Sequence, residues 1–117
     1  PDGTTSKIMY DHGKDTRLRD NVWDINTGFN RSTKDKEAFK HPAIFPETLA
    51  ADHIKTWSNI WDTILDPMMG SGTTGKMAII NDRNFVGFEL DKDYFELAEK
   101  RIDFYHKIKD REKEIFD

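Results

Sequence analysis

A glycine-rich turn between an apolar run and a helical stretch constrains the fold of this chain more than any other feature. It lies in Asp66–Gly75, which has the sequence Asp-Pro-Met-Met-Gly-Ser-Gly-Thr-Thr-Gly. The run Thr63–Asp66 before it predicts a short buried strand, and the residues from about Thr73 to Asn81 predict a helix. Glycines let the backbone turn tightly and let a ligand approach closely. This order of elements predicts a βα unit that binds its ligand beyond the carboxyl end of the strand.

The pattern around this unit, from His41 onward, alternates between helix and strand. Pro46 predicts the start of a helix that ends near residue 58. Phe85–Leu90 predicts a second buried strand. Asp91 or Asp93 is the expected N-cap of a last helix, and a glutamate three residues after Asp93 would complete a capping box. The order helix, strand, helix, strand, helix predicts an α/β fold with a parallel sheet and flanking helices.

The first 40 residues are polar and show little periodicity, so they are expected to be mostly loop. The charged stretch at residues 31–40 is expected to be an exposed connector. We therefore expect two parts: 1–40 as the tail of an upstream region, and 41–117 as the α/β part. The first residue is Pro1 rather than Met, which favours a piece of a longer protein.

Composition limits the partners that the chain can have. The formal net charge of −4 gives no overall basic surface for nucleic acid. With no cysteine, neither a disulfide nor a zinc–thiolate site is expected, and the four histidines show no metal-ligand spacing. No apolar run approaches the roughly 20 residues that span a membrane. A cytoplasmic protein without membrane or metal partners is expected.

An acid follows the glycine turn at a distance that indicates a nucleoside ligand. Glu89 stands at the predicted end of the second strand, 19 residues after Gly70. A carboxylate in that place can accept hydrogen bonds from both hydroxyl groups of a ribose.

Three nucleoside ligands fit this pattern to different degrees. Gly70–Gly75 has the spacing of a dinucleotide motif, but a carboxylate at Asp66 would repel a pyrophosphate. Gly70–Lys76 matches most of a P-loop, but Met77 stands where a Ser or Thr would hold magnesium. S-adenosylmethionine fits best, since Asp66 would attract its cationic groups and a helix N-terminus suits its carboxylate. A P-loop nucleotide hydrolase is kept as an alternative.

Three motifs in this chain resemble those of a known family. Asp66–Gly75 closely resembles the cofactor motif of bacterial and phage DNA methyltransferases that modify exocyclic amines. His41–Leu49 looks like the second cofactor element of the beta arrangement of that family, and Phe85–Ile102 looks like its ribose-binding strand and following helix. The resemblance implies part of a Rossmann-like, S-adenosylmethionine-dependent methyltransferase fold. The implied activity is methyl transfer to N6 of adenine or N4 of cytosine in DNA.

The resemblance also implies which residues would bind the cofactor. Those of the glycine turn would surround the methionine half, and Glu89 would hold the ribose. Leu90 and Asp91 would lie beside the adenine, and His41 and Phe45 would close the other side. The full implied set is His41, Phe45, Asp66, Met68, Gly70, Ser71, Gly72, Thr73, Thr74, Glu89, Leu90 and Asp91.

The catalytic element of that family is an Asp/Asn/Ser-Pro-Pro-aromatic tetrapeptide, which orients the target amine and stacks on the flipped base. Proline occurs here only at positions 1, 42, 46 and 67, so no Pro-Pro pair is present. We therefore assign no catalytic residue and expect the chain alone not to methylate. The tetrapeptide would lie upstream in a longer protein or on a second chain, and DNA would bind through the complete protein. A non-catalytic partner or regulatory fragment is the second alternative.

Overall fold

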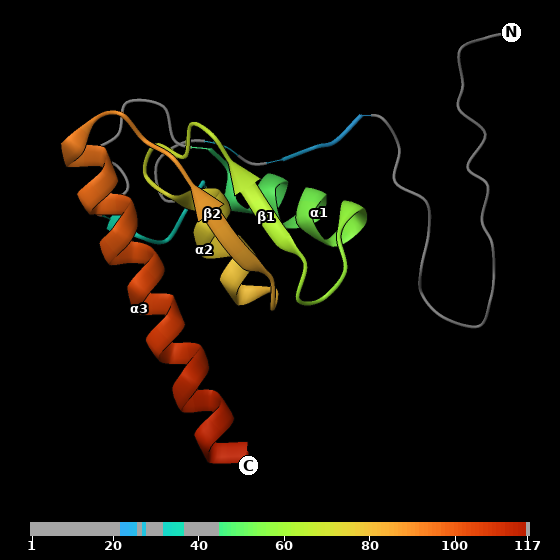
Figure 1. The fold of residues 1–117 in the computed structure, drawn as a ribbon. Helices are drawn as coiled ribbons and strands as arrows, with labels where there is room; N and C mark the ends of the chain where they lie inside the picture. The colour runs from blue at the N-terminus through green and yellow to red at the C-terminus, as the bar shows by residue number, and fades with distance from the viewer. Residues whose placement is uncertain (1–21, 26, 28–31, 37–44, 117) are drawn as a thin grey trace, which may run out of the picture.

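A computed structural model describes residues 22–25, 27, 32–36 and 45–116 of the chain (Figure 1). Helices and strands alternate in the predicted order: α1 (Glu47–Trp57), β1 (Thr63–Asp66), α2 (Thr73–Ile80), β2 (Asn84–Gly87) and α3 (Lys92–Phe116). Of the two expected N-caps for α3, Asp91 is the one that caps, because its Oδ1 accepts a hydrogen bond from Tyr94 N at 3.0 Å. None of the helices in the described ranges combines the length and the apolar character needed to cross a membrane.

The two strands are parallel neighbours, with Thr63 opposite Asn84 and Asp66 opposite Gly87. Their carboxyl ends therefore meet at one edge of the sheet. β2 ends at Gly87, earlier than the predicted end at Leu90. Beyond it, Phe88 N donates to Asp66 O at 3.0 Å, and Met69 N donates to Phe88 O at 2.9 Å. These bonds tie the end of β2 to the glycine turn instead of continuing the strand.

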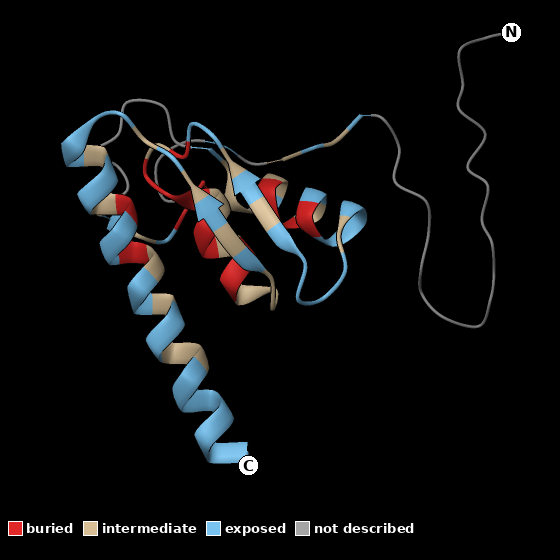
Figure 2. Ribbon diagram, in the orientation of Figure 1, coloured by how far each residue is buried: buried red, intermediate tan, exposed pale blue. Residues whose placement is uncertain are grey.

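Helix α2 packs against both strands and lies between α1 and α3 (Figure 1). The prediction of buried strands is wrong for one face of the sheet. Phe85 faces α2 and is half-buried, whereas Leu65 and Val86 on the other face are 62% and 45% exposed (Figure 2). Within the described residues the helices cover only the face that α2 contacts, so burial alternates along each strand.

Small residues let α2 approach both the sheet and α3 closely. Gly75 of α2 has no room for a side chain, because a Cβ there would lie 2.5 Å from Ile102 Cδ1 and 2.7 Å from the Phe85 ring. Gly72, the N-cap of α2, has a φ of +79°, and a Cβ there would lie 2.9 Å from Ala98 Cβ. Ala98 is completely buried. The glycine turn and α3 are therefore in direct contact.

The segment at residues 32–36 packs against the helices, so the expected exposed connector is wrong for its buried members. Ser32 and Thr33 are 5% and 3% exposed. Ser32 O accepts from Glu47 N at 2.9 Å, and the Thr33 hydroxyl donates to the Glu47 carboxylate. Asp35 reaches further, to α2 and α3. Of the charged residues in this segment, Asp35 forms ion pairs with the helices, whereas Lys34 and Lys36 are exposed.

Candidate functional site

A cavity of about 470 Å³ opens at the edge of the sheet where β1 and β2 end. Its volume lies within the range typical of small-molecule sites. Apart from Met69, every described residue of its wall belongs to the set that the family resemblance implied for the site. The wall is formed by Phe45, Asp66, Met68, Met69, Gly70, Ser71, Thr73, Thr74 and Glu89.

The glycine turn is closed on itself by backbone and carboxylate contacts. Asp66, the last residue of β1, accepts a hydrogen bond at Oδ1 from Met68 N at 3.1 Å. Gly72 N donates to Met69 O at 2.8 Å. Gly70 and Gly72 both have positive φ angles, 52° and 79°, which side chains disfavour. The two glycines thus allow a turn that brings Asp66, Ser71 and the start of α2 to one cavity.

Glu89 connects the turn to the end of β2. It lies two residues beyond the strand rather than at its end. Its Oε2 accepts a hydrogen bond from Gly70 N, and its Oε1 accepts one from Asp91 N, both at 2.9 Å. A carboxylate oxygen has two acceptor positions, so each oxygen keeps one for a ligand. The two backbone donors hold the carboxylate in place before any ligand arrives.

The cavity wall combines two carboxylates with a helix N-terminus. Asp66 and Glu89 contribute carboxylates, and among the described residues that line the cavity none is a Lys, Arg or His. The first N–H groups of α2 have no partner within the helix and favour an anionic group. Thr73, in that first turn, has a buried hydroxyl without a hydrogen-bond partner among the described residues. Buried hydroxyl groups are normally paired, so Thr73 points to a missing partner at this wall.

Lys76 does not face the cavity. Its Nζ lies 2.8 Å from Asp35 Oδ2 and 2.8 Å from Glu47 Oε1, and its side chain is 4% exposed. Burial alone would lower the pKa of Lys76, but the hydrogen bonds to Asp35 and Glu47 outweigh it and raise that pKa above its ordinary value. The lysine of a P-loop must reach the phosphates. The position of Lys76 therefore argues against a nucleoside triphosphate at this turn.

Three of the predicted site residues that the structure describes do not line the cavity. Leu90 is fully exposed, and Asp91 caps α3. Gly72 turns toward Ala98 of α3 rather than toward the cavity. His41 lies outside the described residues. Within the described ranges, no group of three histidine or acidic side chains is arranged for a metal ion.

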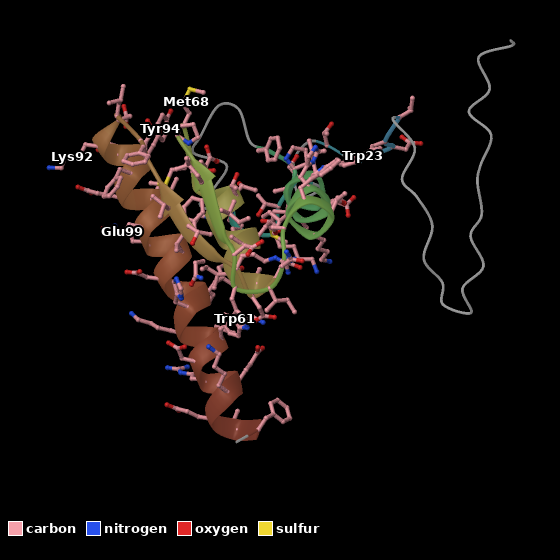
Figure 3. The ribbon with its side chains drawn as sticks, turned by 45° about the vertical axis from the view of Figure 1, so that its right-hand side comes forward. Trp23, Trp61, Met68, Lys92, Tyr94 and Glu99 are labelled. Carbon is pink, nitrogen blue, oxygen red and sulfur yellow. The ribbon has the colours of Figure 1, made fainter. Side chains whose placement is uncertain are left out.

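Two residues of the site were missed by the sequence analysis. Met69 is 8% exposed and packs against Gly87, whereas its neighbour Met68 is 83% exposed and projects outward (Figure 3). Arg101, in α3, is 6% exposed and donates to the carbonyl of Ser71. A signal for Arg101 was present, since it stands between Ala98 and Ile102 in the apolar stripe of its helix. A charged residue inside such a stripe requires a buried partner.

Comparison with known proteins gives consistent matches. A family model described as DNA methylase matches residues 2–100. The orphan methyltransferase M.BamHII of Bacillus amyloliquefaciens is 52% identical over 92 residues, covering 79% of this chain and 35% of its own length. The DNA adenine methyltransferase YhdJ of Escherichia coli (strain K12) is 37% identical over 95 residues, covering 80% of this chain and 30% of its own.

A solved structure matches as well. The crystal structure of an M1.HpyAVI-SAM complex has 35% sequence identity and a TM-score of 0.57, and it covers 76% of this chain and 40% of that one. This match confirms the predicted α/β fold. The chain spans about a third of the length of the curated relatives it matches.

Proposed function

The chain belongs to the DNA methylase family, and from this premise we propose that it supplies the S-adenosylmethionine site of a DNA methyltransferase. The parent protein would transfer a methyl group to N6 of adenine or N4 of cytosine. One observation carries the proposal. One cavity at the carboxyl ends of two parallel strands is lined by the carboxylates of Asp66 and Glu89 and by the first residues of α2.

The residues of the cavity fit the chemistry of this cofactor. Asp66 would attract the cationic sulfonium and ammonium groups. Glu89 would bind the ribose hydroxyls through the acceptor positions that the Gly70 and Asp91 amides leave open. When bound, S-adenosylmethionine supplies an electrophilic methyl group.

The anionic end of the cofactor would lie at α2. The free N–H groups of the first helical turn favour its carboxylate. Thr73, whose buried hydroxyl has no partner among the described residues, and Thr74 stand in that turn. Phe45, which is partly exposed at the cavity wall, would offer an apolar surface to the ligand.

Methyl transfer to DNA is proposed for the whole protein rather than for this chain. The chain contains no Pro-Pro-aromatic tetrapeptide, and its match to M.BamHII covers only 35% of the length of that relative. The tetrapeptide and the DNA-recognition surface would come from the remainder of the protein or from a second chain. Since bacterial DNA lies in the cytoplasm, the proposed activity places the protein there. Neither alternative, P-loop hydrolase or regulatory fragment, finds support among the relatives named above, which are methyltransferases.

Calorimetric titration tests the cofactor proposal directly. S-adenosylmethionine is titrated into the chain, and ATP with magnesium is titrated in parallel. We expect binding of S-adenosylmethionine only, and a loss of about tenfold or more in affinity for Glu89→Gln, because charge-assisted hydrogen bonds contribute about 1.5–3 kcal/mol each. The matched control is Glu99→Gln, since Glu99 is exposed and points away from the sheet (Figure 3).

Two results of this titration would count against the proposal. One is binding of ATP with magnesium without binding of S-adenosylmethionine. The other is equal affinity of the Glu89→Gln and Glu99→Gln variants, which would mean that Glu89 does not contact the ligand.

A further inference from the structure

We propose that Arg101 is a positioning residue for the cofactor site, acting from behind the glycine turn. Arg101 is not among the described residues that line the cavity, but it holds the peptide that joins Ser71 to Gly72. Asp35 in turn holds Arg101. The shape of the cavity wall would thus depend on a residue outside all three cofactor motifs. The inference rests on the proposed function only for its ligand-binding readout.

The contacts of Arg101 divide between the turn and Asp35. Its Nη1 donates to the Ser71 carbonyl and also lies 3.2 Å from Ser71 Oγ. Its Nε and Nη2 donate to Asp35 Oδ2 at 3.2 Å and 3.0 Å. The planar guanidinium group presents its N–H donors in a fixed fork that spans both directions, whereas an ammonium group is a compact point charge without that fork.

These contacts fix one peptide plane of the turn at both ends. The carbonyl of Ser71 accepts from Arg101, and the amide of Gly72 donates to Met69 O at 2.8 Å. Gly72 has a left-handed backbone, so sterics alone do not prevent this peptide from rotating. Rotation would turn a carbonyl oxygen toward the start of α2, where the proposed ligand carries its carboxylate. Arg101 prevents this by keeping the Ser71 carbonyl on the side of α3.

Arg101 is itself fixed by an ion cluster of two buried cations, Lys76 and Arg101, and two half-buried carboxylates, Asp35 and Glu47. Lys76 lies 2.8 Å from both Asp35 and Glu47, and Arg101 Nη2 lies 3.6 Å from Glu47. Tyr105 donates its hydroxyl to Asp35 at 3.0 Å. The four charged members come from the 32–36 segment, α1, α2 and α3, and their charges balance. The cluster therefore anchors the back of the turn to four separate parts of the fold.

The test compares Arg101→Lys with wild type in the full 117-residue chain. This variant keeps the charge but loses the forked geometry. Hydrogen exchange of the amides at residues 68–74 is measured without ligand, and S-adenosylmethionine affinity is measured by calorimetry. We expect about tenfold faster exchange confined to the turn and about tenfold weaker binding, the effect of losing one charge-assisted hydrogen bond. Arg111→Lys, at an exposed position of α3, is the matched control and should change neither.

Asp35→Asn is the second variant, because its amide keeps one acceptor oxygen and disturbs the packing less. It should also speed up amide exchange in the turn, but by a smaller factor than Arg101→Lys. If the turn amides of Arg101→Lys exchange at the same rate as those of the wild type, the proposal is overturned. An increase spread evenly over α1, α2 and β1 would overturn it too, because it would assign Arg101 to general stability. If wild type binds no S-adenosylmethionine, the proposed function fails, while the exchange pattern still decides the role of Arg101.

Discussion

Gly72→Ala should destabilise the chain strongly, because two separate costs coincide at this position. Gly72 has a φ of +79°, and placing a residue with a Cβ in the left-handed region costs roughly 1–2 kcal/mol. The new Cβ would also lie 2.9 Å from Ala98 Cβ and 3.0 Å from Ala98 Cα. The second contact is with the backbone of α3, so the helix itself must shift. Overpacking of this kind costs about 1–3 kcal/mol.

The expected loss is therefore about 3.5 kcal/mol in the free energy of unfolding, the midpoint of a summed range of roughly 2–5 kcal/mol. Urea unfolding followed by circular dichroism measures it. The double variant with Ala98→Gly removes the contact with Ala98 Cβ, whereas the strained φ and the contact with Ala98 Cα remain. A coupling energy of about 1 kcal/mol between the two sites is expected, as for residues in direct contact.

An unfolding free energy for Gly72→Ala within about 0.5 kcal/mol of wild type, the range of ordinary surface substitutions, would refute this reasoning. If the free-energy changes of the two single variants simply add in the double variant, the contact with Ala98 Cβ carries no cost. The cost of the strained φ would be unaffected by that result.

Three further predictions concern the ion cluster and the turn. Lys76→Met should cost about 3 kcal/mol of unfolding free energy in urea, because it leaves two partly buried carboxylates facing one remaining cation, Arg101; a loss no larger than that of an exposed Lys→Met change would contradict the cluster. Burial alone would raise the pKa of Asp35, but Lys76, Arg101 and Tyr105 outweigh it and hold that pKa below its ordinary value of 3.8. The stability from Asp35 is therefore complete above pH 3.8 and is lost as the pH falls through the lowered value, so the wild type should lose more stability than Asp35→Asn in acid unfolding; equal acid sensitivity would be evidence against the pairing. Met69→Ala should cost about 2 kcal/mol or more because Met69 is buried against Gly87, whereas Met68→Ala, at an exposed neighbour, should stay within about 0.5 kcal/mol in the same unfolding assay; the reverse order would show that the two side chains are misplaced.

The order of helices and strands was predictable because it depends on local signals. A proline at 46 marks the start of α1, the apolar run before Asp66 forms β1, and two glycines allow the turn that starts α2. The lengths of the helices and strands were harder to predict. β2 ends at Gly87 because the residues after it bond to the turn, which is a contact with another part of the chain. The predicted boundary between residues 40 and 41 remains a prediction.

Most residues around the cavity could be predicted from the motif, because a glycine turn and the end of the next parallel strand must meet at one edge of the sheet. The difference in burial between Met68 and Met69 was not predictable in this way. Which of Met68 and Met69 turns inward depends on the left-handed backbone that follows and on the space above Gly87. No periodic pattern in the sequence carries that information.

By itself, the sequence determined that a strand, a glycine turn and an acid lie in the order of a nucleoside site, since adjacent residues specify that order. Only the tertiary structure decided what stands behind the turn. Asp35 meets Lys76 and Arg101 across 41 and 66 residues of sequence. Many surface charges could pair in principle, and burial selects the pairs, because a desolvated charge is stable only beside its opposite. The same packing sends Lys76 away from the cavity and brings Arg101 to the carbonyl of Ser71.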